Sequence, residues 1–271
     1  MPPVCTNNSN ALWFDHITRV HKPLFRLFCF AHAGGNAHVF RNWQRYLAPE
    51  VDLCLVHLPG HGKRIGERPF TQLAPLIAAV ANEISDEAGL PFAFYGHSLG
   101  ALISFELARE LYRRGQRGPR RLFLSGHRAP HLPNSACRIF DLSDEDFIRS
   151  LKGLNGTPDE LLDERQTREF FLPMFRADFE IVDTYEYYDR PPLPCPLSVY
   201  GGLADDSVPA ESIYAWQVHT SAECRVRMFS GDHFFVHDLA SGFFDAFRND
   251  VSAVLYSVGT EYTSACVTGN D

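Results

Sequence analysis

Short apolar runs that alternate with amphipathic segments restrict the fold of this chain more than any other feature of its sequence. Four runs have the length of buried strands: LFRLFCF (24–30), VDLCLVHL (51–58), PFAFY (91–95) and RLFLSG (121–126). Three longer segments between them place their apolar residues at helical spacing: 37–48, 70–88 and 99–114. Apolar strands separated by helices are typical of a mostly parallel sheet that helices cover on both faces. The sequence therefore predicts an α/β fold.

The alternation stops between residues 128 and 195 and then resumes. This interval contains the long amphipathic segment REFFLPMFRADFEIVDTYEYY, and it is too long to be a simple loop. After it come a strand (PLSVYGG), a helix over 209–219, a strand (CRVRMFS) and a last helix over 238–256. We expect one domain, 1–271, with a helical lid (128–195) inserted between late strands. We expect residues 1–23 to be irregular and the tail from Ser257 to be frayed.

Charge and cysteine usage narrow the cellular setting. The formal net charge of −8 disfavours nonspecific binding to nucleic acid or to an anionic membrane. The seven cysteines are scattered without a C-x-x-C pair, which favours reduced thiols over a disulfide framework. The first residues lack the basic start and apolar core of a signal peptide, and no apolar run reaches the ~18 residues that span a bilayer. We expect a cytoplasmic monomer.

The stretch FAFYGHSLGA (92–101) contains a G-x-S-x-G pattern centred on Ser98. Five letters match by chance in many glycine-containing loops, and Ser98 could be an ordinary turn serine. Its position at the end of a predicted strand, directly before a predicted helix, is the context of a nucleophile elbow. Gly96 and Gly100 permit the close backbone approach that such a turn needs. We interpret Ser98 as a catalytic nucleophile.

A serine nucleophile needs a base and an orienting acid, and both residue types follow late strands. In the α/β-hydrolase chain order the acid comes after the serine and the histidine comes last. The segment GGLADDSVP offers Asp205 and Asp206, between which chain position does not decide. The segment SGDHFFVHD offers His233 behind the last strand, which we prefer to His237 because the latter can belong to the final helix.

Two backbone amides are expected to stabilise the oxyanion of an acyl-transfer reaction. One belongs to Leu99, the residue after the nucleophile, and the other to the turn after the first predicted strand. That turn is HAGG (32–35), and we assign the donor to the amide of Ala33. The alternative is a plain glycine turn.

Other function classes fit the sequence less well. The pairs His57/His61 and His233/His237 have i, i+4 spacing, but neither carries the glutamate of H-E-x-x-H. Gly-x-Gly at residues 60–62 lacks a third glycine at dinucleotide-binding spacing, and no P-loop occurs. We therefore expect no metal and no cofactor. A non-catalytic binding module is disfavoured because the serine, acid and histidine are all present.

Eight stretches together resemble the type II thioesterases of polyketide and nonribosomal peptide synthesis and the related animal fatty-acid chain-terminating thioesterases. They are HAGG, LPGHGKRIGERP, FYGHSLGA, LFLSGHRAP, GLNGTPDELL, LPMFRADFEIVDTYEYY, GGLADDSVP and SGDHFFV. They extend over about residues 24–250, and the GTP…LP…RAD segment is specific to this family. The family often has Pro where Ala31 stands and Arg where His61 and His127 stand.

The resemblance implies an α/β-hydrolase fold and a Ser98–Asp205–His233 triad, because the family acid lies in G-G-x-x-D-x-x-V. It also implies Ala33 and Leu99 as the oxyanion donors. The expected activity is hydrolysis of acyl groups from the phosphopantetheine arm of an acyl or peptidyl carrier protein, to edit stalled or misprimed synthases. The alternatives are chain release in fatty-acid or polyketide synthesis and a serine esterase acting on substrates other than thioesters.

Two further segments have open interpretations. Five residues of the lid lie at roughly helical spacing and could line an acyl pocket or simply pack the lid onto the core: Phe171, Phe175, Phe179, Val182 and Tyr185. The basic run YRRGQRGPRR (112–121) is a solvated helix end in the simpler interpretation and a docking site for an acidic carrier protein in the other.

Overall fold

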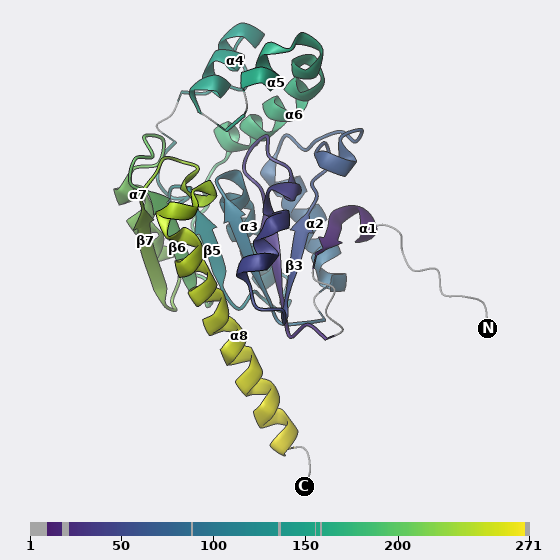
Figure 1. Ribbon diagram of the computed structural model, residues 1–271, viewed down its shortest axis with the longest axis vertical. Coiled ribbons are helices and arrows are strands. Elements are labelled where there is room, and N and C mark those ends of the chain that lie inside the picture. The colour runs from purple at the N-terminus through teal and green to yellow at the C-terminus, as the bar shows by residue number, and fades with distance from the viewer. Residues whose placement is uncertain are drawn as a thin grey trace, which may run out of the picture.

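A seven-stranded sheet forms the centre of the molecule in the computed structural model, which describes residues 10–17, 22–87, 89–134, 137–154, 156–157 and 159–268 (Figure 1). The strands are β1 (Phe14–His16), β2 (Phe25–Phe30), β3 (Val51–Val56), β4 (Phe92–His97), β5 (Leu122–Ser125), β6 (Leu197–Gly202) and β7 (Cys224–Phe229). Their order is β1-β3-β2-β4-β5-β6-β7, and every neighbouring pair is parallel except β1 with β3. The prediction of a mostly parallel sheet is confirmed.

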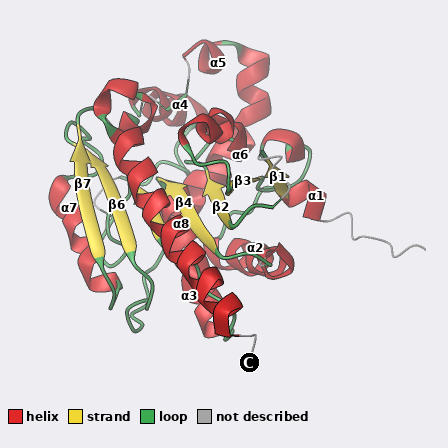
Figure 2. Cartoon of the chain, turned by 60° about the horizontal axis from the view of Figure 1, so that its bottom comes forward, coloured by secondary structure: helices red, strands yellow, loops and turns green. Residues whose placement is uncertain are grey.

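Helices cover both faces of the sheet, and two separate apolar cores result. On one face α2 (Leu73–Glu87) and α3 (Leu99–Arg113) pack in one core. On the other, a 3₁₀ helix (Ala37–Tyr46) and α8 (Phe243–Thr268) pack in the second, and Figure 2 shows α8 crossing this face. None of the helices in the described ranges is long and apolar enough to cross a membrane.

Two segments near the ends of the chain contain regular structure that the sequence did not predict. Instead of an irregular lead-in, α1 (Asn10–Trp13) leads into β1, which pairs with β3; a strand of three residues is too short for a periodic signal. Residues 1–9 and 18–21 lie outside the described residues. The expected fraying from Ser257 is also wrong, because α8 continues and Val258 is buried in the core.

A helical insertion separates β5 from β6. It consists of α4 (Asp144–Gly153), α5 (Asp159–Asp163) and α6 (Arg165–Thr184), which Figure 1 shows together at the top of the molecule. The three helices share a small apolar core of their own. The remaining helices are α7 (Ala210–Tyr214) and short 3₁₀ helices at Gly62–Arg64, Ala215–His219, Phe235–His237 and Leu239–Ser241.

The turn between β4 and α3 is unusually tight. Ser98 has φ of 54° and ψ of −119°, and it has the one positive φ of a non-glycine residue among those described. A Cβ on Gly96 would lie 2.0 Å from the carbonyl oxygen of Gly100, and a Cβ on Gly100 would lie 2.1 Å from that of Phe30. Glycine is required at both positions because backbone, rather than a movable side chain, fills the space.

We expect Gly100→Ala to lower the free energy of unfolding by about 1–3 kcal/mol, because the added methyl group would displace the backbone of β2. Urea denaturation followed by circular dichroism measures the change. Gly153→Ala is the control, since a Cβ at Gly153 would meet no described atom outside its own stretch of helix within 4 Å, and its φ is not positive. Equal stability of the two variants would contradict the close approach.

Candidate active site

Ser98 lies where the central strand β4 meets the first turn of α3. Its N–H donates to the carbonyl of Ser125 at the end of β5, at 2.8 Å. The N-terminal turn of α3 has N–H groups without intrahelical acceptors and a positive dipole, and both favour negative charge beside Ser98. The hydroxyl therefore stands at the carboxyl edge of the sheet, in a field that stabilises an anion.

Asp205 and His233 form a hydrogen-bonded pair. His233 Nδ1 lies 2.7 Å from Asp205 Oδ2, and the other carboxylate oxygen accepts the N–H of Ser207 (2.9 Å) and of Val208 (3.1 Å). Burial alone would raise the pKa of Asp205, but His233 and Ser207 lower it, and the net shift is downward. The carboxylate is therefore charged and can fix one tautomer of the imidazole.

The two members of each pair of alternatives have different surroundings. Asp206 is exposed, whereas Asp205 is buried against His233. His237 lies in a 3₁₀ helix, and its ring stacks on Phe234 with a centroid distance of 5.8 Å. In the described part of the chain no carboxylate is hydrogen-bonded to His237.

A cavity of about 220 Å³ lies between the carboxyl edge of the sheet and the helical insertion. Ser98, His233 and Ala33 all line it, so the hydroxyl, the imidazole and the turn after β2 open into the same space. Three histidines line this cavity (His32, His127 and His233), and only His233 is bonded to a carboxylate. Burial lowers the pKa of His32 to about 4 and of His127 to about 3, so both are neutral near pH 7.

The turn after β2 has the hydrogen bond and backbone sign of a type II β-turn. Gly35 N–H donates to the carbonyl of His32 at 2.9 Å, and Gly34 has φ of +75°. The residue between them, Ala33, lines the cavity, while Leu99 follows Ser98 in the first turn of α3. The two residues assigned as oxyanion donors therefore follow neighbouring strands, since β2 pairs with β4.

The five predicted lid residues divide among three cavities. Phe179 and Val182 line the cavity of Ser98. Phe171 and Phe175 line a neighbouring cavity of about 420 Å³, which Ser98 does not reach.

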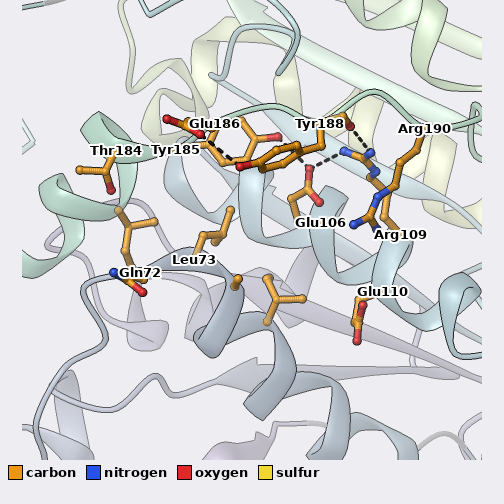
Figure 3. A pocket seen from close by; sticks show the side chains of 13 residues that line it. Gln72, Leu73, Glu106, Arg109, Glu110, Thr184, Tyr185, Glu186, Tyr188 and Arg190 are labelled. Atoms are coloured by element: carbon orange, nitrogen blue, oxygen red, sulfur yellow. Dashed lines mark hydrogen bonds and ion pairs between the residues drawn. The ribbon is translucent and has the colours of Figure 1, made fainter.

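Tyr185 lies outside both of these cavities, in a third of about 600 Å³ between α2, α3 and the end of α6 (Figure 3). Its hydroxyl donates to Glu106 at 2.7 Å, and Glu106 also accepts from Arg109. The helical spacing used for the prediction does not extend to this residue, because α6 ends at Thr184 and Tyr185 is extended.

Two polar residues beside the site were missed by the sequence analysis. Ser207 donates its hydroxyl to Asp205 at 2.6 Å. Asp178, on α6, is 3% exposed and accepts the N–H of Gly34 at 2.7 Å. A signal was available for Asp178, because it lies three residues after Phe175 on the apolar stripe of an amphipathic helix, where a charged side chain needs a partner.

One group of possible metal ligands occurs among the described residues, and it lies outside the cavity of Ser98. Asp15, His38 and His57 place one ligand atom each within 4.8 Å of one another. The Asp15 carboxylate already binds His57 (2.9 Å) and Lys63 (2.5 Å), which leaves little negative charge for a cation.

We expect a fluorophosphonate probe to modify Ser98, since the strained turn and the His233–Asp205 pair together activate this hydroxyl. Peptide mapping by mass spectrometry identifies the modified residue. Ser98→Ala should abolish labelling, and Asp205→Asn should slow it by at least about a hundredfold. Ser150→Ala is the control, because Ser150 lines the same cavity but donates to the carbonyl of Asp146. Labelling that persists in Ser98→Ala would contradict the assignment.

Comparison with known proteins agrees with this geometry. The family model "Thioesterase domain" matches residues 25–250. The gramicidin S biosynthesis protein GrsT of Aneurinibacillus migulanus is 40% identical over 226 residues, which cover 83% of this chain and 88% of GrsT. RedJ, the thioesterase from the prodiginine pathway of Streptomyces coelicolor, superimposes with a TM-score of 0.79 at 36% identity, over 86% of this chain and 91% of RedJ.

A second solved structure is YbtT, a type II thioesterase from the yersiniabactin nonribosomal peptide and polyketide pathway. It has a TM-score of 0.79 at 30% identity, covering 90% of this chain and 99% of YbtT. The family match spans most of the chain, and GrsT and RedJ share at least 36% of their aligned residues with it. The chain belongs to the type II thioesterase family and has the α/β-hydrolase fold of that family.

Proposed function

We propose that this thioesterase hydrolyses acyl groups from the phosphopantetheine arms of acyl or peptidyl carrier proteins, and so clears stalled or misprimed synthases. The observation that carries the proposal is that Ser98 and His233, which is bonded to Asp205, line one cavity at the carboxyl edge of the sheet. Carrier-bound substrates are supported by the pathways named for RedJ and YbtT. Chain release uses the same chemistry and is the alternative.

The proposed reaction has two stages, acylation of Ser98 and hydrolysis of the acyl-enzyme. His233 takes the proton of Ser98, and the Ser98 oxygen attacks the thioester carbonyl. The N–H groups of Ala33 and Leu99 donate to the oxyanion, while Asp205 stabilises the imidazolium that forms. The thiolate leaves readily, because a thiol has a pKa of about 8.5, and it takes the proton from the His233 imidazolium, so that His233 is again a neutral base. Water activated by His233 releases the acid and restores the hydroxyl of Ser98.

The helical insertion acts in this proposal as a lid over the acyl group. Phe179 and Val182 from α6 supply apolar surface beside Ser98. One domain with an inserted lid, a monomeric state and a cytoplasmic location remain predictions from the sequence. Free thiols at Cys29, Cys54, Cys137, Cys195 and Cys224 agree with a reducing compartment.

Four of the five arginines in the basic run at the end of α3 have acidic partners within the molecule, which favours a solvated helix end over a carrier-docking site. Arg113 and Arg114 both pair with Glu110. Two later arginines also have acidic partners: Arg120 pairs with Glu261 and Arg121 with Glu223. A docking surface for an acidic partner needs cations that are free of such partners.

We expect the wild-type protein to remove the acyl group from acetyl- and octanoyl-phosphopantetheinyl carrier proteins, and Ser98→Ala to leave both intact. Intact-protein mass spectrometry of the carrier measures the loss of acyl mass. The Ser150→Ala variant should act like the wild type. An acyl carrier that stays unchanged with the wild-type enzyme, while a simple ester is cleaved, would favour the serine esterase alternative.

Enlarging Val182 should change the preference for acyl chain length. Val182→Phe reduces the space beside Ser98, and we expect hydrolysis of the octanoyl carrier to fall about tenfold relative to hydrolysis of the acetyl carrier. The ratio of kcat/KM values for the two carriers measures the effect. Tyr185→Phe is the control, because Tyr185 lines a different cavity and should leave the ratio unchanged. An unchanged ratio in Val182→Phe would place the acyl chain elsewhere.

A further inference from the structure

A single carboxylate oxygen joins three segments that are far apart in sequence. Asp178 lies on α6 of the insertion, and its Oδ2 accepts the N–H of Gly34 at 2.7 Å and a hydrogen bond from His61 Nε2 at 2.9 Å. Gly34 belongs to the turn after β2, and His61 follows β3. The carboxylate of Asp178 and the ring of His61 are both more than nine-tenths buried.

The hydrogen bonds of His61 require a charged ring. Its Nδ1 faces the carbonyl of Pro59 at 3.1 Å, while Nε2 faces Asp178. Carbonyl and carboxylate oxygens only accept hydrogen bonds, so both ring nitrogens must carry a proton. Burial acts to lower the pKa of His61, but the charge and hydrogen bond of Asp178 outweigh it and the net shift is upward. A buried ion pair therefore connects the insertion to the sheet.

The ion pair controls the backbone that follows Ala33. The Gly34 N–H belongs to the peptide unit between Ala33 and Gly34, and Asp178 fixes the direction of this unit. The bond from Gly35 to His32 fixes the other side of the turn. A Cβ on Gly34 would lie 2.1 Å from the ring of Phe175, so α6 also packs directly on the turn.

We propose that Asp178 and His61 are positioning residues that hold the turn containing Ala33 in its catalytic geometry only while α6 is seated on it. The inference rests on the proposed function, because it needs the Ala33 amide as an oxyanion donor. Neither side chain lines the cavity of Ser98, so each acts through the turn and not on the substrate. Lifting α6 would remove the acceptor from the Gly34 N–H and leave the Asp178 carboxylate and the His61 ring unpaired. The enzyme therefore hydrolyses its substrate only while α6 is seated on the turn that contains Ala33.

The test compares Asp178→Asn, His61→Gln and His61→Arg with the wild type on acetyl-pantetheine. We expect the first two variants to lose kcat on the order of 10²-fold with KM nearly unchanged, since small displacements of catalytic groups have effects of this size. The Ki of a trifluoromethyl ketone should rise by the same factor, because its adduct carries an oxyanion that uses the same donors. His61→Arg should have a kcat and a Ki close to those of the wild type, because arginine is always charged and offers several hydrogen-bond donors.

Asp250→Asn is the matched control. Asp250 is also a buried carboxylate, but it lies on α8 and is bonded to Tyr200 and Arg227, outside the cavity of Ser98, and its loss should lower stability without changing the Ki. Unchanged kcat and Ki in folded Asp178→Asn would overturn the proposal, as would a loss of kcat without a rise in Ki. If Asp178→Asn does not fold, the kcat and Ki of His61→Gln, compared with those of His61→Arg, test the proposal by the same criteria. A wild-type enzyme that cleaves no thioester would instead contradict the proposed function.

Discussion

The backbone strain at Ser98 is the constraint on which the rest of the site depends. A non-glycine residue with positive φ has a conformational cost of about 1–3 kcal/mol, and it persists only where the surrounding structure leaves no alternative. Here the surroundings are the central strands of the sheet. The Ser98 N–H is held by the end of β5, and Gly100 lies against the backbone of β2. The hydroxyl can be presented at the edge because the strands on either side of it cannot move independently.

The parallel order of the late strands brings the other two polar groups together. Asp205 follows β6 and His233 follows β7, and these strands are neighbours. The loops behind them are packed backbone to backbone: Ala204 N–H donates to the carbonyl of Gly231 at 2.9 Å, and a Cβ on Gly202 would lie 2.3 Å from a carbonyl oxygen. The distance between carboxylate and imidazole is thus set by main-chain contacts and not by long flexible side chains.

Sequence patterns predicted the features that local order determines, and they missed those that depend on tertiary contacts. The sheet and the turn at Ser98 follow from periodicity and from glycine at two positions. The choice between Asp205 and Asp206 required the family resemblance, because adjacent aspartates have the same local sequence signal. Tyr185 was misplaced because the end of α6 carries no stop signal. Asp178 was missed because its partners come from elements more than a hundred residues away.

The short antiparallel strand β1 has a consequence for how the molecule behaves in concentrated solution. Without it, β3 would be the edge of the sheet, and all six residues of β3 are buried. An apolar strand with free N–H and C=O groups is a template for pairing with another chain. At the opposite edge, β7 carries Arg225 and Arg227, two partly exposed polar side chains that disfavour the approach of an apolar strand. The strand β1 at one edge of the sheet and the two arginines of β7 at the other thus disfavour the pairing of this sheet with a strand of a second molecule.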